Sequence, residues 1–369
     1  MKISIGSKIV EGPWGGGNLF AINMSKYLTS MGHEVIYNLY EEGIDLILLT
    51  DPRKRGISSS TFNHKDVFNY KRFVNPNTTV IQRVNECDQR KGTKNINKLF
   101  LNASKVSDHV IFVSAWLRDI YIQLGLEKNK TSVVLAGADK DVFNPKGYNS
   151  WEPGKKLKIV THHWSSNYNK GFKEYLMIDS LISKPEWKNK IEFTYIGNLP
   201  TQNYFKNTKL VAPLSGLELA KEIKENHVYI TGSINEPSGN HHIEAAQCGL
   251  PIIYKVSGGI PEYCENFGIE LSNDIEETIN RMFAEYNNIQ KNMQNYPLDS
   301  KKMCDEFYEL FLKSMEINAL KNKNYKSYFF KKNIFKFRHY LALKFWNTKY
   351  LSQVLKIILN IYEKRINEN

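Results

Sequence analysis

Several features that mark particular protein classes are absent from this sequence of 369 residues. It contains no run of about 18 apolar residues, so no helix is expected to span a bilayer. The chain does not begin with the charged and apolar segments of a secretory signal peptide. Its four cysteines form no CxxC pair, and we expect reduced thiols in the core rather than disulfides or zinc ligands. These absences favour a cytoplasmic protein.

The positive charge is concentrated at one end of the chain. The net charge is +12, and residues 317–369 hold 12 Lys and Arg against 2 Glu, whereas the other residues are nearly balanced. A nearly neutral body argues against nucleic acid as a partner. Aromatic and aliphatic residues alternate with the basic ones in 317–369, as is typical of segments that lie on an anionic membrane surface. Packing on the body, covered by lysine stems, is the alternative.

Short β-branched runs alternate with helical stretches along most of the chain, which is typical of parallel α/β units. The first unit runs from the strand at 2–10 through a glycine-rich turn to a helix that ends at Gly32. Residues 52–78 lack a clear pattern and are interpreted as a long loop or small excursion. Turn-forming residues near 145–155 interrupt the alternation. We therefore expect an α/β protein with two Rossmann-like domains, residues 1–148 and 149–316, and a basic helical tail at 317–369.

Two glutamates, Glu236 and Glu244, stand eight positions apart in the stretch GSINEPSGNHHIEAAQCGLPIIY. A metal site is disfavoured, because the adjacent His241 and His242 would point roughly 100° apart on a helix. A pair of general acid and base carboxylates is a second interpretation, for which the sequence supplies no separation. In a third interpretation the stretch binds a phosphorylated sugar, and in a fourth the two glutamates are solvated surface charges.

The third interpretation uses the start of the helix. Gly239 lets the backbone approach a ligand closely, and free N–H groups at a helix start, together with the helix dipole, attract an anion. Glu244 is an acceptor suited to the diol of a ribose, and Glu236 can accept hydrogen bonds from sugar hydroxyls.

The stretch EPSGNHHIEAAQCGLPII resembles the E-x7-E signature of retaining GT-B glycosyltransferases of family 4. The matching residues are Glu236, Gly239, Glu244, Ala245, Cys248, Gly249 and Pro251. SGGIPEYCENFGIEL resembles the family's following Gly-Gly-x-Pro-Glu turn, which faces the donor, and VVLAGADKDVFNP resembles its interdomain segment. The resemblance reaches from the glycine-rich loop to about residue 316 and implies a GT-B fold with a cleft between the two domains.

The resemblance also implies roles for individual residues. Glu244 would bind the ribose of a nucleotide-sugar donor, and Glu236 would bind the transferred hexose. Lys170, in NKGF, matches the family's Lys-Gly and would neutralise the leaving diphosphate. Glu236 and Lys170 are therefore the candidate catalytic residues. The candidate donor-binding residues are Glu244, Gly239, Asn240, His241, Gly16, Gly17 and Ser165.

The sequence departs from the family at one phosphate-binding position. Ser165 stands where an Arg usually lies, five positions before the Lys, so Arg83 and Arg90 are candidate substitutes. Ser114 is interpreted either as a helix N-cap or as a ligand contact. The polar segment 82–92 follows a strand at the place expected for the acceptor, although a solvated loop is the alternative. Its candidate acceptor ligands are Asn85, Glu86, Asp88, Arg90 and Lys91.

Together these features predict a retaining hexosyltransferase of cell-surface polysaccharide synthesis, with a glycan or lipid-linked acceptor. The resemblance implies neither a metal nor a cofactor, because helix N–H groups and Lys170 would handle the phosphates. We expect a cytoplasmic protein that lies on the inner membrane face through residues 317–369. A sugar-nucleotide epimerase or hydrolase and a non-catalytic nucleotide-sugar-binding protein are the alternatives.

Overall fold

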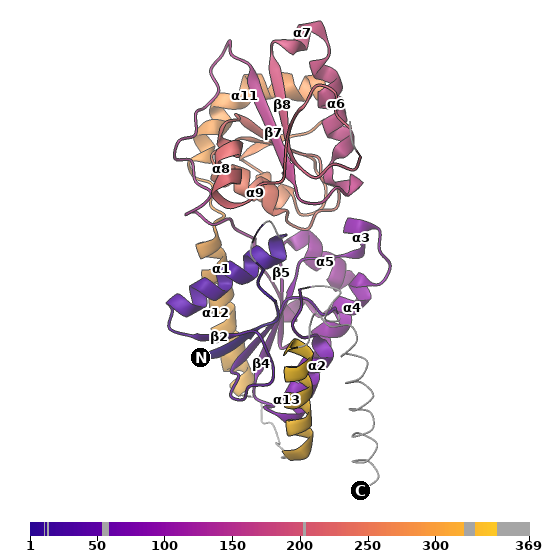
Figure 1. The fold of residues 1–369 in the computed structure, drawn as a ribbon, viewed down its shortest axis with the longest axis vertical. Coiled ribbons are helices and arrows are strands. Elements are labelled where there is room, and N and C mark those ends of the chain that lie inside the picture. Colours follow the sequence, from indigo (N-terminus) through magenta and orange to yellow (C-terminus); the bar gives the residue numbers. More distant parts are fainter. Residues whose placement is uncertain (11, 13–14, 54–58, 202–203, 321–328, 345–369) are drawn as a thin grey trace.

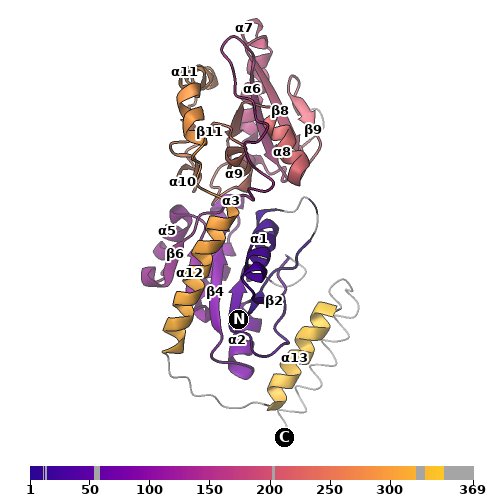
Figure 2. The same cartoon turned by 90° about the vertical axis from the view of Figure 1, so that its left-hand side faces the viewer.

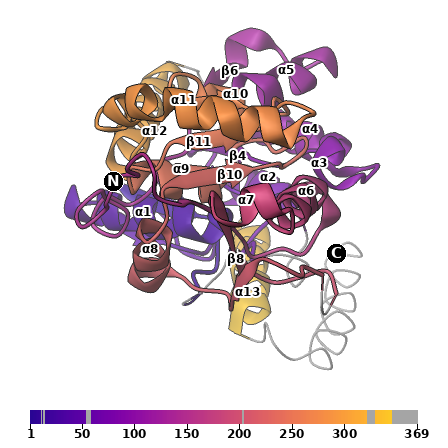
Figure 3. The same ribbon diagram turned by 90° about the horizontal axis from the view of Figure 1, so that it is seen from above.

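The computed structural model describes the chain except residues 11, 13–14, 54–58, 202–203, 321–328 and 345–369. Its described part forms two α/β domains, which lie one above the other in Figure 1, each around a parallel six-stranded sheet. Seen from above, the C-terminal domain overlies the N-terminal one (Figure 3). All four cysteines are buried and unpaired. Among the described residues, no helix is long and apolar enough to cross a membrane.

The N-terminal sheet has the strand order β2-β1-β3-β4-β5-β6. Its central strands β3 and β4 are buried along their whole length, as expected for parallel strands covered by helices on both faces. The elements are β1 (Lys2–Ile5), α1 (Gly16–Ser30), β2 (Glu34–Ile36), β3 (Leu46–Leu49), α2 (His64–Phe73), β4 (Thr79–Val84), α3 (Asp88–Lys91), α4 (Ile96–Ala103), η1 (Ser104–Val106), β5 (His109–Phe112), α5 (Ala115–Gln123), η2 (Lys128–Lys130) and β6 (Thr131–Val133).

The C-terminal sheet has the strand order β12-β11-β10-β7-β8-β9. The elements from residue 157 onward are β7 (Leu157–His163), η3 (Tyr168–Lys170), α6 (Phe172–Ile182), α7 (Pro185–Lys188), β8 (Ile191–Gly197), β9 (Lys209–Val211), α8 (Gly216–Lys224), β10 (Val228–Thr231), α9 (Asn240–Gln247), β11 (Ile252–Tyr254), α10 (Pro261–Cys264), β12 (Gly268–Glu270), α11 (Ile275–Met293), α12 (Ser300–Ala319) and α13 (Phe329–Lys344). In both sheets the carboxyl ends of the strands face the other domain (Figure 1).

The interpretation of residues 52–78 as a loop is wrong for part of the segment. Helix α2 occupies His64–Phe73 and is stabilised at its start by a capping box, in which Asn63 and Asp66 satisfy each other's backbone N–H groups. Val67 and Tyr70 are its buried side chains, and most of its other residues are polar. An apolar stripe of two residues gives only a weak helical period, and for this reason the sequence pattern did not predict helix α2.

Helix α12 leaves the C-terminal domain and packs on α1 and β4 of the N-terminal domain (Figure 2). The rings of Phe307 and Phe20 lie 5.1 Å apart, and the hydroxyl of Tyr27 donates to Asp305 at 2.7 Å. The chain therefore crosses between the domains twice. The domain limits expected from the sequence stay a prediction, to which the structure adds that residues 300–316 pack on the first domain.

The described part of the basic tail, α13, packs against α2. Phe335 and His339 are buried there, with Phe335 6.3 Å from Tyr70 between ring centroids. Lys332 and Lys336 form ion pairs with Glu42. One face of this helix thus packs on the body, as in the alternative interpretation. The expected membrane contact stays a prediction, and residues 321–328 and 345–369 lie outside the described part.

Candidate active site

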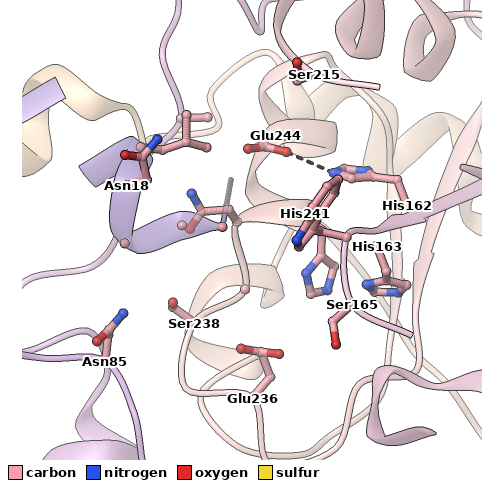
Figure 4. Close-up of a pocket in the computed structure, with 18 of the residues that line it drawn as sticks. Asn18, Asn85, His162, His163, Ser165, Ser215, Glu236, Ser238, His241 and Glu244 are labelled. Carbon is pink, nitrogen blue, oxygen red and sulfur yellow. Dashed lines mark hydrogen bonds and ion pairs between the residues drawn. The ribbon is translucent and has the colours of Figure 1, made fainter. Parts of the chain in front are cut away.

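A cavity of about 630 Å³ lies between the two domains and takes its lining from both (Figure 4). The nine residues named as catalytic or donor-binding candidates all line it, and their roles stay predictions. They are Glu236, Lys170, Glu244, Gly239, Asn240, His241, Gly16, Gly17 and Ser165. Such convergence follows from the topology, because loops at the carboxyl ends of two parallel sheets meet across one cleft.

Gly239 is the N-cap of helix α9 and has a conformation that suits glycine. Its φ is +80°, and a Cβ atom there would lie 2.7 Å from Cε1 of His241 and 2.8 Å from Cε1 of His242. Both contacts are too short for any other residue unless the imidazole rings move, and the positive φ strains any other residue as well. The glycine therefore keeps the N–H groups of the first turn of α9 open toward the cavity.

The starts of two helices approach each other across the cleft. Gly16 is the first residue of α1 and Asn240 the first of α9. A Cβ on Gly16 would lie 2.8 Å from Oδ1 of Asn240, whereas one on Gly17 would meet open space. Because each helix start carries unpaired N–H groups and a partial positive charge, this part of the cavity suits an anion such as a phosphate.

Glu236 forms the centre of an ion-pair network that joins the domains. Its Oε1 forms an ion pair with Nε of Arg90, on α3, at 3.0 Å, and its Oε2 pairs with Nζ of Lys170, on η3. Glu236 is buried. Burial by itself raises the pKa of Glu236, but Arg90 and Lys170 outweigh that effect and lower the pKa to about 2. At neutral pH this side chain is a carboxylate that can accept hydrogen bonds and has no proton to donate.

The same network continues into the N-terminal domain. Arg90 and Lys91 each lie 3.4 Å from Oε2 of Glu86, a buried side chain of the predicted acceptor segment. Asn85, Glu86, Arg90 and Lys91 line the cavity. Asp88 is different: its carboxylate accepts from Ile96, Asn97 and Thr93 and holds the start of α4. Asp88 is not among the lining residues, and its predicted acceptor contact stays a prediction.

Glu244 is held by a histidine that sequence reasoning did not single out. Oε2 of Glu244 and Nε2 of His162, at the carboxyl end of β7, are 2.9 Å apart (Figure 4). Nδ1 of His162 is buried without a protein partner. The pair fixes the orientation of the Glu244 carboxylate at the cavity wall. His162 lies in an apolar strand motif, THHW, where no spacing rule marks a ligand-binding histidine.

The other histidines of the site are packed against one another. His163, His241 and His242 are buried, and the ring centroids of His163 and His241 lie 4.6 Å apart. Nε2 of His241 lies 2.9 Å from the hydroxyl of Thr231. Burial lowers the pKa of all three, that of His242 to about 3, so these rings are neutral at physiological pH. His241 also lines the cavity.

The turn at residues 257–262 lies behind the site. The N–H of Gly259 donates to the carbonyl of Glu236 at 2.9 Å, and the carboxylate of Glu262 accepts from the N–H groups of Ala115 and Trp116 at the start of α5. None of the turn's residues lines the cavity. The expectation that this turn faces the donor stays a prediction. The turn supports the Glu236 loop and ties the C-terminal domain to α5.

The structure gives the positions of two serines that were singled out from the sequence. Ser114 is buried, accepts from the N–H of Leu117 at 3.3 Å and is the N-cap of α5, which is the structural interpretation. Ser165 is exposed in the loop after β7, where its Oγ accepts from the N–H of Asn167 at 3.3 Å. Figure 4 shows Ser165 among the residues that line the cavity, and its predicted donor contact stays a prediction.

The sequence also did not indicate that the loop before α8 belongs to the site. Pro213, Leu214, Ser215 and Gly216 line the cavity beside Glu244. Ser215 is the N-cap of α8, yet its hydroxyl makes no capping hydrogen bond, so it is available to a ligand. Within the described part of the chain, no group of three or more His, Cys, Asp or Glu side chains is placed to hold a metal ion. The prediction that no metal is needed is not tested by this finding.

No family model and no curated protein matches the sequence. Solved structures do match the fold. Sucrose-phosphate synthase from Thermosynechococcus elongatus superposes with a TM-score of 0.63 at 14% identity, over 86% of this chain and 99% of that one. HepE from Anabaena, solved with UDP and glucose, gives 0.59 at 14% identity over 84% and 99%. A glycosyltransferase from Rickettsia africae gives 0.60 at 14% identity over 85% and 98%. The expected fold class is confirmed: this chain has the two-domain GT-B fold.

Proposed function

We propose that this chain is a glycosyltransferase that moves a hexose from a nucleotide-sugar to an acceptor hydroxyl with retention of configuration. One observation carries the proposal. The open start of α9 at Gly239, the Lys170–Glu236 pair and Glu244 meet in a single interdomain cavity. These groups match, in order, the diphosphate, the hexose and the ribose of one donor molecule.

The donor proposed first for testing is UDP-glucose. HepE, which shares the fold, was solved with UDP-glucose and with UDP and glucose. In our proposal the starts of α1 and α9 and the ammonium of Lys170 bind the diphosphate. Glu244, oriented by His162, accepts from the ribose hydroxyls, and Glu236 accepts from the hexose hydroxyls.

The reaction breaks the bond between the anomeric carbon and the diphosphate oxygen and forms a bond from that carbon to the acceptor oxygen. Negative charge develops on the leaving diphosphate, where Lys170 and the two helix starts stabilise it. The acceptor proton passes to the leaving phosphate on the same face of the sugar. Glu236, whose pKa is about 2, is unsuited to protonate a leaving group and instead orients the hexose. Neither a metal nor an organic cofactor is required in this scheme, so chelation leaves the rate unchanged.

The acceptor class in this proposal is a glycan or lipid-linked sugar of cell-surface polysaccharide synthesis. The excess of basic residues in 317–369 and the exposed Phe337 and Tyr340 on α13 support contact with an anionic bilayer on the cytoplasmic side. We expect cosedimentation with phosphatidylserine vesicles and its loss when Lys349 and Lys356 are both changed to Glu. Equal sedimentation of this variant and the wild type would refute the membrane contact.

The donor proposal is tested by thermal shift with a panel of nucleotide-sugars on the wild type, Glu244→Ala and Lys170→Ala. At least one nucleotide-sugar raises the wild-type Tm, and both substitutions reduce the rise. If none stabilises the wild type, or neither substitution matters, the site assignment fails. Sugar release or epimerisation without an acceptor would favour the alternative enzymes, and tight binding without turnover would favour a binding protein.

A further inference from the structure

Arg83 is a buried cation in the wall of the cleft that the proposed chemistry does not use. It lies near the carboxyl end of β4, beside Ile111 of β5, and its side chain lines the interdomain cavity. Only 4% of the residue is exposed. Its guanidinium stacks on the ring of Phe20, from α1, with 4.1 Å between Cζ and the ring centroid. The strand and the aromatic ring thus hold the guanidinium in one place.

This guanidinium has no anionic partner within the described residues. Its Nε is buried without a hydrogen-bond partner, and among the described residues no side-chain hydrogen bond or ion pair of the guanidinium is found. Burial lowers the pKa of Arg83 to about 10, and the one described group that raises it is Tyr263, a neutral phenol. An isolated buried charge is costly, so a side chain of this kind is expected to meet an anion in the working protein.

Three half-buried cations that also line the cavity are already paired. Lys170 and Arg90 share Glu236, and Arg53 lies 2.8 Å from Asp51. No hydrogen bond or ion pair joins Arg83 to Lys170, Arg90 or Glu236 among the described residues. An anionic group that reaches Arg83 would therefore meet a cation that no described carboxylate neutralises.

We propose that the acceptor carries an anionic oxygen group, a phosphate or a carboxylate, and that Arg83 binds it. This inference rests on the proposed function and names its acceptor class. Arg83 comes from the N-terminal wall, two residues before Asn85, whereas Lys170 and the start of α9 come from the C-terminal wall. A planar guanidinium with free donors suits the paired oxygens of either anion, and selects against a neutral acceptor that leaves it unsatisfied.

The inference is tested on the full chain in three forms: wild type, Arg83→Met and the control Arg72→Met, which removes an exposed arginine of the same domain. UDP is first titrated alone by calorimetry. Inorganic phosphate, glucose 6-phosphate and glucuronate are then titrated onto protein saturated with UDP, so that the diphosphate site is already occupied. The two phosphates and the carboxylate identify which anion is preferred.

We expect Arg83→Met to bind the preferred anion about tenfold or more weakly, as the loss of charge-assisted hydrogen bonds implies, and to bind UDP as the wild type does. The Tm of free Arg83→Met should equal or exceed that of the wild type, because an uncompensated charge is removed. A structural arginine would instead show a lower Tm and an unchanged response to the anions, and that result would overturn the inference.

The same titrations distinguish two further outcomes. If Arg83→Met weakens UDP binding as strongly as Lys170→Met does, Arg83 binds the donor diphosphate and the inference is wrong. If UDP fails to bind the wild type, the donor proposal fails. The anions are then titrated onto the protein without UDP. Weaker anion binding to Arg83→Met than to the wild type would support the inference, and equal binding to both would overturn it.

Discussion

Two charged groups of the cleft, the Glu236–Lys170 pair and Arg83, are satisfied in opposite ways. On the C-terminal wall, Glu236 and Lys170 are paired, and Arg90 reaches from the other domain to complete the group. On the N-terminal wall, Arg83 is equally buried and stacks on Phe20 without an anionic partner. A paired charge is placed before the substrate arrives, whereas an unpaired charge is most stable once a ligand is bound. The paired charges therefore suit the orientation of a substrate, and the unpaired charge of Arg83 suits the selection of an anionic substrate.

The largest expected effect comes from the paired wall. Changing Lys170 to Met removes the cation beside the leaving diphosphate, and we expect the transfer rate to fall about 100-fold or more, as for the loss of one electrostatic stabiliser. The assay measures UDP release in the presence of acceptor. The matched control is Lys173→Met, an exposed lysine three positions away on α6. A rate for Lys170→Met within twofold of the control, roughly the scatter of surface changes, would show that the pair does no chemistry.

The next effect concerns stability and its dependence on pH. Because the pKa of Glu236 falls from 4.5 to about 2 on folding, its ionisation stabilises the wild type by about 3 kcal/mol at neutral pH. The sign follows from the lowered pKa: the contribution is full above pH 4.5 and is lost as the pH falls toward 2.

Glu236→Gln is therefore expected to unfold more easily in urea at pH 7 than the wild type, with the gap narrowing below pH 4.5. Urea titrations at several pH values measure this gap. A gap that stays constant with pH would mean that hydrogen bonding, and not ionisation, holds the network together.

A smaller effect separates orientation from direct contact. His162→Phe keeps a ring of similar size but removes the partner of Glu244. We expect about tenfold weaker UDP binding, comparable to the loss of one supporting hydrogen bond to a charged group. If Glu244 acts on the ribose through this orientation, the double variant His162→Phe/Glu244→Gln will bind little worse than Glu244→Gln alone. Additive losses would mean that His162 contacts the nucleotide by itself.

The smallest effect compares two adjacent glycines. A Cβ at Gly16 would meet Asn240 from the opposite wall, whereas one at Gly17 would meet no atom. Gly17→Ala is expected to raise the free energy of unfolding by up to about 1 kcal/mol through helix propensity. Gly16→Ala has a smaller gain, because the Asn240 side chain must move away from the added Cβ atom. Thermal unfolding of both variants checks the difference, and equal Tm values would argue against the close approach.

The parts of the site that follow from local chemistry were predictable from the sequence. Gly239 before a helix, flanked by Glu236 and Glu244, signals an anion site, and the alternation of strands and helices places that site at a strand's carboxyl end. The network around Glu236 was not predictable, because Arg90 joins it from a separate domain 146 positions earlier in the chain. Only the packing of the two domains brings these side chains together.

The missed features share a cause. Helix α2 is anchored by two buried side chains, so its period was too weak to recognise. Helix α12 has an apolar stripe that the sequence shows clearly, but a stripe does not reveal which domain it covers. His162 and the loop at 213–216 lie beside ordinary strand and turn residues, and they become site residues through position in the fold.

The most direct test of the account is a calorimetric titration of UDP-glucose into the wild type and into Lys170→Met. The account predicts saturable one-to-one binding to the wild type and a loss of about tenfold or more in the variant, because a phosphate then lacks its cation. Undetectable binding to the wild type, or equal binding to both proteins, would contradict the claim that this cleft holds a nucleotide-sugar.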